Sequence, residues 1–303
     1  MKMEESKPVQ GTQTCLTLLN LEVNMKIRIV TDTAADCLEQ EIENWNIEVV
    51  NLPVTFDGEL EPCQDVNLFW KTLMSGSTAR TSQPSPDVFC QLFEDARKHN
   101  DALIYISISS KLSGTFANAL AIKQQYGYDN VYVVDSLGAT AAEKILVHEA
   151  CKLRDEGVEA SEIVAKLNEL KHRVKLYACI DSLKYLARGG RISKTTATIG
   201  ALINIKPLIT LTDGQVVPYS KSIGSVLAMN KIVEVMKASN VDSSYAPVPM
   251  YSFDKKNALA FVKRANEHGL NIDDKYLTPI GATIGTHTGP GGFGIVFIES
   301  PSL

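Results

Sequence analysis

The chain has 303 residues, of which 45% are hydrophobic and 21% charged, a composition typical of a globular protein with a sizeable core. The net charge of −5 and the lack of a basic run argue against a nucleic-acid surface, and no apolar run is long enough for stable membrane insertion. The six cysteines are far apart and form no C-x-x-C pair, which predicts neither a metal site nor a disulfide framework and favours a cytoplasmic location.

Residues 1–24 form an extension that we exclude from the fold. Its apolar segment CLTLLNL is too short for a signal peptide and contains Asn20, and two glutamates, Glu4 and Glu5, precede it. Met25, which opens MKIRIVTD, could equally be the first native residue. We therefore expect residues 1–24 to be disordered or to lie ahead of the native start.

In the first half of the chain, short β-branched runs alternate with helical patterns. Strands are predicted at 26–32, 47–56, 103–109 and 131–135, and helices at 88–99, 115–127 and 140–157. This alternation is typical of βαβ units and predicts a mostly parallel α/β domain over residues 25–165. Sheets of this kind bind ligands beyond the carboxyl ends of their strands.

The second half changes character and predicts an α+β domain with hairpins over residues 166–303, which would complete the ligand site. A hairpin is predicted at 207–220, where Asp213-Gly214 is a type I′ turn signal. The remaining elements are predicted as helices at 160–174, 181–193, 225–238 and 255–268, a strand at 175–181, and two strands within 279–299 around a glycine-rich loop.

Hydroxyl side chains recur at the strand ends. In SSKLSGTF, Ser113-Gly114-Thr115 lies where a strand gives way to a helix, so free backbone N–H groups and hydroxyls could seat an anion, or Ser113 or Thr115 could simply cap the helix. In TSQPSP (81–86), Ser85 and Pro86 are typical of a helix start, which leaves Thr81 and Ser82 without a structural role.

His287 lies in the glycine-rich loop GTHTGPGG, predicted between two strands, where a structural and a functional role are equally favoured. Arg188 and Arg191 flank two glycines and could hold a phosphate or form a salt-bridged surface patch. The sequence contains no phosphate-binding P-loop, dinucleotide fingerprint, nucleophile elbow or H-E-x-x-H motif. Neutral hydroxyls with one histidine suit holding an anion better than transforming it.

Seven motifs in this order, from Met25 to the carboxyl terminus, resemble those of the DegV family of bacterial fatty-acid-binding proteins, which includes the binding subunits of fatty acid kinase. They are IVTDTAAD (29–36), TSQPSP (81–86), ISSKLSGTF (108–116), VVDS (133–136), ARGGRIS (187–193), INIKPLI (203–209) and HTGPG (287–291). Each motif is weak alone, but their joint order is specific.

The resemblance implies a two-domain α/β protein that binds a long-chain fatty acid, needs no cofactor or metal, and catalyses nothing itself. It implies that Thr81, Ser113 and His287 hold the carboxylate, and that a separate ATP-using kinase subunit converts it to an acyl phosphate for phospholipid synthesis. The supporting head-group loops would be Ser82, Gly114, Thr115, Thr286 and Gly289. The partner-docking residues would be Arg188, Arg191 and Lys221.

One segment departs from the family pattern. Many relatives have an arginine-rich stretch after the hairpin, whereas PYSKSIGS (218–225) has Lys221 alone. Two alternatives to the carrier also remain open. Ser113 or Thr81 could pair with His287 in an acyl hydrolase or transferase, or the chain could be a lipid-responsive regulator or bind another amphipathic acid.

Overall fold

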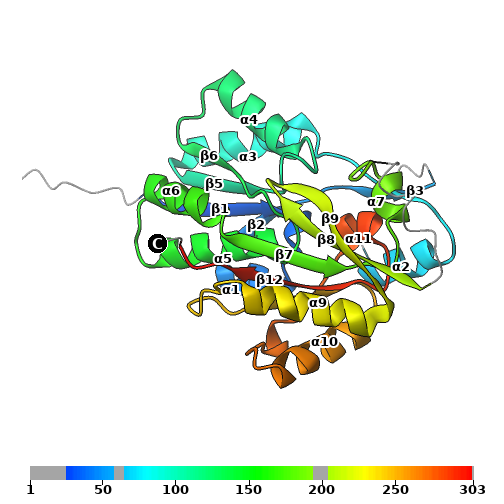
Figure 1. The fold of residues 1–303 in the computed structure, drawn as a ribbon. Helices are drawn as coiled ribbons and strands as arrows, with labels where there is room; N and C mark the ends of the chain where they lie inside the picture. The colour runs from blue at the N-terminus through cyan, green and yellow to red at the C-terminus, as the bar shows by residue number, and fades with distance from the viewer. Residues whose placement is uncertain (1–24, 58–64, 194–203, 302–303) are drawn as a thin grey trace, which may run out of the picture.

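The computed structural model describes residues 25–57, 65–193 and 204–301, which form two main sheets packed with helices (Figure 1). The predicted extension, residues 1–24, lies outside the described residues. The first sheet, sheet A, has the order β2-β1-β5-β6 and is parallel throughout. Its strands are β1 (Ile27–Asp32), β2 (Ile47–Val50), β5 (Ala102–Ser107) and β6 (Val131–Asp135). The predicted parallel α/β fold is confirmed.

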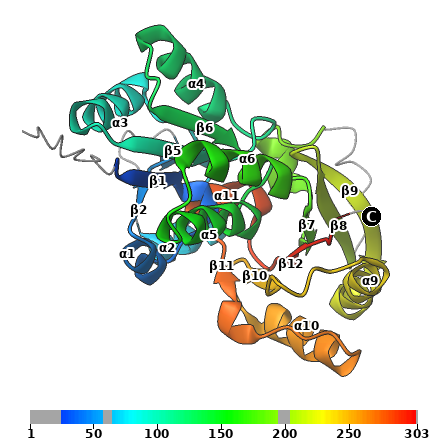
Figure 2. The ribbon, with the colours of Figure 1, turned by 90° about the vertical axis from the view of Figure 1, so that its left-hand side faces the viewer.

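Helices cover both faces of sheet A because its strands are apolar on both sides. On one face, α3 (Pro86–His99) and α4 (Thr115–Tyr126) pack on Val30, Leu103 and Tyr105. On the other, α5 (Ala141–Asp155) and α6 (Ala160–Leu170) pack on Ile29, Ile104 and Ile106. Figure 2 shows the two helix pairs on either side of the sheet. A shorter helix, α1 (Glu39–Trp45), links β1 to β2.

The segment predicted as one strand over 47–56 is two strands, so that prediction was wrong. After β2 the chain leaves sheet A, and β3 (Val54–Phe56) pairs antiparallel with β4 (Ala79–Thr81) in a separate ribbon. Pro53 lies at the break, where a residue without an N–H group cannot continue a central ladder. Helix α2 (Val66–Met74) buries Phe69, Trp70 and Leu73 against this ribbon.

The second sheet, sheet C, has the order β11-β10-β12-β7-β8-β9 and is mostly antiparallel, as predicted for an α+β region. Its strands are β7 (Val174–Cys179), β8 (Ile205–Thr212), β9 (Gln215–Ile223), β10 (Val248–Tyr251), β11 (Thr278–Pro279) and β12 (Phe293–Ile298). The β8–β9 hairpin is confirmed, and Asp213 and Gly214 have φ values of 48° and 78°, as a type I′ turn requires.

The two faces of sheet C bury different partners because side chains alternate along each strand. The outer face packs on α9 (Gly224–Ala238) and α10 (Lys256–Glu267). The inner face, which includes Leu176, Ala178 and Ile209, faces the carboxyl end of sheet A. Three further short elements are the helix α7 (Lys184–Arg188) and the 3-10 turns η1 (Thr33–Ala35) and η3 (Asp274–Tyr276).

The prediction of two strands around a glycine loop in 279–299 was wrong for its first half. Only Thr278–Pro279 forms a strand, and Ala282–Thr288 forms the helix α11. The β-branched residues of ATIGTHT favour a strand locally, but packing overrides that preference. A Cβ on Gly285 would lie 2.8 Å from the Trp70 ring and 2.9 Å from the Phe69 ring, so the glycine lets α11 approach α2. Gly289 ends the helix with φ 70°.

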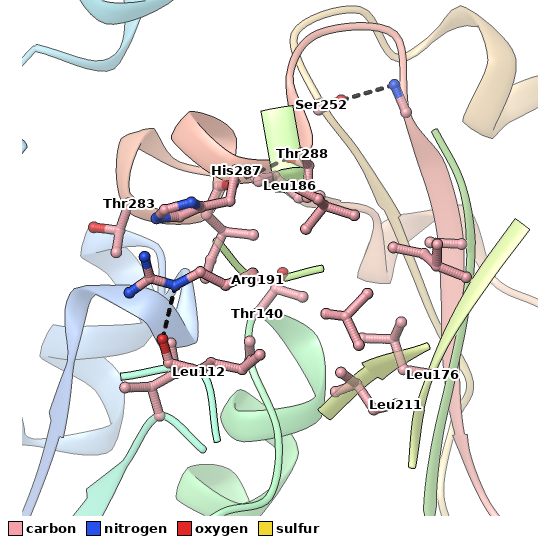
Figure 3. A pocket seen from close by; sticks show the side chains of 18 of the residues that line it. Leu112, Thr140, Leu176, Leu186, Arg191, Leu211, Ser252, Thr283, His287 and Thr288 are labelled. Atoms are coloured by element: carbon pink, nitrogen blue, oxygen red, sulfur yellow. Dashed lines mark hydrogen bonds between the residues drawn. The ribbon is translucent and has the colours of Figure 1, made fainter. Parts of the chain in front are cut away.

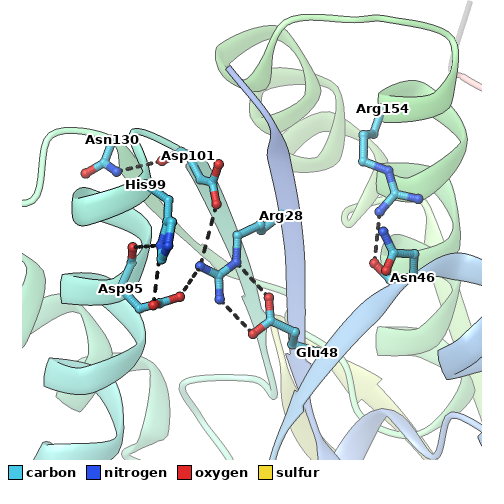
Figure 4. Close-up of polar contacts among 8 residues, drawn as sticks. All are labelled: Arg28, Asn46, Glu48, Asp95, His99, Asp101, Asn130 and Arg154. Carbon is cyan, nitrogen blue, oxygen red and sulfur yellow. Dashed lines mark hydrogen bonds and ion pairs between the residues drawn. The ribbon is translucent and has the colours of Figure 1, made fainter. Parts of the chain in front are cut away.

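An ionic network joins elements at the amino-terminal edge of sheet A, which is opposite the carboxyl ends of its strands (Figure 4). The Arg28 guanidinium lies 2.8 Å from the Glu48 carboxylate and 2.7 Å from that of Asp95. It joins β1, β2 and α3, and Asp101 lies 3.7 Å away. This edge therefore takes a structural role, and the carboxyl edge is left for the site.

Candidate functional site

A cavity of about 250 Å³ lies between the carboxyl end of sheet A and the inner face of sheet C. Most of its lining is aliphatic. Sheet C contributes Leu176, Ala178, Ile209, Leu211, Val216 and Met250, and other segments contribute Leu52, Ile108, Leu112, Ile180, Leu186, Ile280 and Ile284. The polar lining residues are Thr81, Ser82, Gln83, Ser113, Thr140, Arg191, Thr210, Ser252, Thr283, His287 and Thr288. An apolar cavity with polar groups on part of its wall is the usual make-up of a small-molecule site.

Thr81 and His287 meet at the cavity, although 206 residues separate them. Thr81 ends β4, and His287 lies in the last turn of α11 rather than in the loop predicted between two strands. The Thr81 hydroxyl and the His287 Nε2 atom are 2.9 Å apart. The contact places a hydroxyl and an imidazole side by side on the cavity wall.

His287 is held as a neutral ring. Burial, with the guanidinium groups of Arg191 and Arg188, lowers the pKa of His287 to about 4. Its Nδ1 atom is buried and has no hydrogen-bond partner among the described residues. Gly189 packs on that atom, since a Cβ at this position would overlap it. Gly189 packs against the Nδ1 side of the ring, and the hydrogen bond with Thr81 holds the Nε2 side.

Ser113 and Gly114 line the same cavity at the amino end of α4. The Ser113 hydroxyl is 2.8 Å from that of Thr115 and accepts a hydrogen bond from the Thr115 N–H at 3.3 Å. Thr115 is fully buried as the first helical residue, so it orients Ser113. Gly114 has the Gln83 amide directly over it and leaves no room for a Cβ.

Arg191 also lines the cavity, as Figure 3 shows beside His287. Its Nε donates to the Leu112 carbonyl at 2.9 Å and its Nη1 to the Gly189 carbonyl at 2.5 Å. Burial lowers the pKa of Arg191, but a guanidinium stays protonated in proteins. By contrast, Arg188 and Lys221 are exposed, and Arg188 lies 5.0 Å from the centre of the Tyr185 ring.

Of the predicted supporting residues, Thr286 and Gly289 are outside the cavity lining, whereas Ser82 is part of it. Thr286 is buried and donates to the Ala282 carbonyl within its own helix at 2.8 Å, so its hydroxyl is not part of the cavity lining. Gly289 packs against the Tyr185 ring, where a Cβ would overlap it. Ser82 is exposed at the cavity mouth, and its N–H donates to the Pro53 carbonyl at 3.0 Å.

Sequence reasoning missed Thr283 and Thr288, which line the cavity from α11 (Figure 3). A helical reading of 282–288 would have brought Thr283 and His287 to one face, because positions four apart are neighbours on a helix. The β-branched pattern hid that signal. The cavity role of Arg191 was also missed, because its motif gives no sign of burial.

These groups can hold an anion by its oxygen atoms. Hydroxyls at Thr81 and Ser113, the amino end of α4 and the Arg191 guanidinium all favour negative charge. No group of three or more His, Cys, Asp or Glu residues in the described part of the chain could hold a metal ion. Within the same residues, no helix is both long and apolar enough to cross a membrane.

Comparison with known proteins identifies the family of this chain. The DegV family model matches residues 26–300. The chain belongs to the DegV family. A DegV domain-containing protein from Caldanaerobacter subterraneus is 34% identical over 90% of this chain and 99% of its own length. A Thermotoga maritima protein named a fatty acid-binding protein is 29% identical over 91% of this chain and 99% of its own.

Solved structures of DegV proteins share the fold. A fatty-acid-binding DegV protein from Thermus thermophilus matches with a TM-score of 0.80 and 27% identity, over 91% of this chain and all of that one. DegV from Bacillus subtilis, described as a fatty acid binding protein, matches with a TM-score of 0.76 and 28% identity over the same shares. In this chain, the segments that carry Thr81, Ser113 and His287 line one cavity.

Proposed function

We propose that this DegV protein binds a long-chain fatty acid in the cavity, with the carboxylate held by Thr81, Ser113 and His287. The observation that carries the proposal is a mostly aliphatic cavity with these three side chains on its wall. Relatives described as fatty-acid-binding proteins support the ligand class. Arg191 is added to the head-group set, because a buried carboxylate needs a compensating charge.

Binding energy would divide between head and tail. Each hydrogen bond to a charged acceptor contributes roughly 1.5–3 kcal/mol. Each buried methylene contributes about 0.8 kcal/mol, so an acyl tail of many carbons dominates the affinity. The head group then fixes orientation, which suits a protein that holds its ligand for another to act on.

We further propose that the protein acts as a non-catalytic carrier that presents the carboxylate to a separate ATP-using kinase subunit, which forms the acyl phosphate. Arg188 and Lys221 are exposed cations available for docking such a partner. The Thr81–His287 contact resembles a nucleophile–base pair, but no acid among the described residues orients the His287 Nδ1 atom. The hydrolase alternative is therefore weaker.

The first test is denaturing extraction of the purified protein followed by mass spectrometry, and then palmitate titration of the delipidated protein. We expect a co-purified fatty acid, and Thr81→Val or Ser113→Ala should each weaken binding roughly 10- to 100-fold. Thr278→Val is the matched control, since its buried hydroxyl donates to Tyr276 outside the cavity. No lipid and no binding would remove the proposal.

The second test measures acyl phosphate formation with a fatty acid kinase subunit and ATP. We expect His287→Ala to slow this step more than it weakens palmitate binding, and Arg188→Ala and Lys221→Ala to slow it with unchanged binding. Lys237→Ala, at an exposed position on α9, is the control. Ester hydrolysis that is lost in Ser113→Ala or Thr81→Val would favour the enzyme alternative instead.

A further inference from the structure

The inner face of sheet C changes from small to large side chains along the cavity. Ala178 lies opposite Gly294 on β12, and Gly294 opposite Met250 on β10, so one row across the sheet has a methyl group and a glycine at its centre. Ile209 completes this row on β8. A Cβ on Gly294 would lie 2.8 Å from the Met250 methyl carbon, so Met250 covers the glycine, and Ala178 contributes only a methyl group to the cavity lining.

The next row along the sheet is bulky. Leu176 pairs with Val296, Val296 pairs with Val248, and Leu211 follows Ile209 by two residues on the same face. Leu176 and Leu211 both line the cavity. Figure 3 shows them across the cavity from His287 and Arg191. The polar end and this leucine pair are therefore opposite limits of one space.

We propose that Leu176 and Leu211 form the end wall of the acyl channel and set the length of the fatty acid that fits. This inference rests on the proposed function. From Ala178 to Leu176 strand β7 advances about 7 Å, at about 3.3 Å per residue. Over that distance a tail passes the methyl group of Ala178 and then meets two branched side chains, which cannot be compressed in a packed core.

The test compares the affinities of laurate, myristate, palmitate, stearate and arachidate for the delipidated protein. In the native chain, each added methylene should strengthen binding about fourfold until the tail reaches the wall, after which affinity should fall. Leu176→Ala and Leu211→Ala each remove three side-chain carbons and should move the optimum to a longer acid. Ala178→Val narrows the channel before the wall and should move it to a shorter acid.

Ile232→Ala is the matched control, because it removes a buried aliphatic side chain from α9 on the opposite face of the same sheet. It should lower stability without moving the optimum. Thermal unfolding of each variant identifies the folded ones, and where an alanine variant fails to fold, Leu176→Val or Leu211→Val, which removes one carbon, tests the wall in its place. An unchanged optimum in the folded variants overturns the wall alone. Absence of binding to every acid by the native chain overturns the proposed function as well.

Discussion

His287 shows how burial tunes a single residue. An unfolded histidine binds a proton near pH 6.5, whereas burial and two nearby guanidinium groups lower the pKa of folded His287 to about 4. Between these values the unfolded chain binds more protons than the folded one. The stability that the neutral ring contributes above pH 6.5 is therefore lost as the pH falls through this window.

We accordingly expect His287→Gln to flatten the acid side of the stability curve. In fatty-acid-free protein, the unfolding temperature of the native chain should fall more steeply between about pH 7 and about pH 5 than that of the variant. Burial raises the pKa of Asp36 to about 7 and of Asp32 to about 6, which acts in the opposite direction, but equally in both proteins. Parallel curves by scanning calorimetry would contradict this account.

At the scale of elements, the motif TDTAAD holds α11 in place from across the molecule. The Gly281 N–H, at the start of α11, donates to Asp36 Oδ1 at 2.9 Å. The Thr33 hydroxyl is 3.0 Å from that of Thr283 and accepts from the Leu52 N–H at 3.0 Å. These hydrogen bonds join α11, the helix that carries His287, to the segment that follows β1. They give the TDTAAD motif a structural role, although none of its residues lines the cavity.

Removal of the Thr33 hydroxyl should therefore impair the site without touching the ligand. We expect Thr33→Val to lower the free energy of unfolding by about 1–3 kcal/mol, because it leaves the Leu52 N–H without an acceptor. It should also weaken palmitate binding, and Thr33→Ser should restore both. Chemical denaturation and palmitate titration measure the two effects.

Arg28→Met supplies the comparison for that variant. It breaks the ionic network at the amino-terminal edge of sheet A and should cost stability. Because this edge is remote from the cavity, palmitate affinity of the folded protein should not change. Weakened binding in Arg28→Met equal to that in Thr33→Val would mean that any loss of stability impairs the site.

At the scale of the whole molecule, the two sheets close around a shared core. One aliphatic cluster combines Ala34, Leu52 and Ile108 with residues of sheet C such as Leu176 and Ile209. The tip of the β8–β9 hairpin reaches the end of β5, where the Ser109 hydroxyl donates to the Gly214 carbonyl at 2.8 Å. This hydrogen bond is one of the contacts that join the two halves around the cavity.

Gly214→Ala should force the halves apart at that contact, since its Cβ would overlap the Ser109 hydroxyl. Gly157→Ala is matched, with φ 79° against 78°, but has nothing within 4 Å of the added carbon. Both should lose stability of about 1 kcal/mol from backbone strain, and Gly214→Ala should lose more and also bind palmitate more weakly. Equal losses in unfolding and titration experiments would show that the contact is unimportant.

The sequence by itself determined the parallel α/β first half, the β8–β9 hairpin and the hydroxyl-bearing segments of the site. These follow from local signals: the alternation of apolar patterns, the Asp213-Gly214 turn and the side chains at strand ends. The order of seven motifs also indicated the family. Such features depend on residues that are close in the chain.

The tertiary structure alone decided which residues meet. It made a helix of 282–288, because Gly285 and Gly289 let that segment pack against α2 and Tyr185 where its β-branched residues favoured a strand. It also turned the Thr286 hydroxyl to a backbone carbonyl and brought Arg191 to the cavity. Contacts across some two hundred residues depend on packing between distant segments, and no local pattern records them.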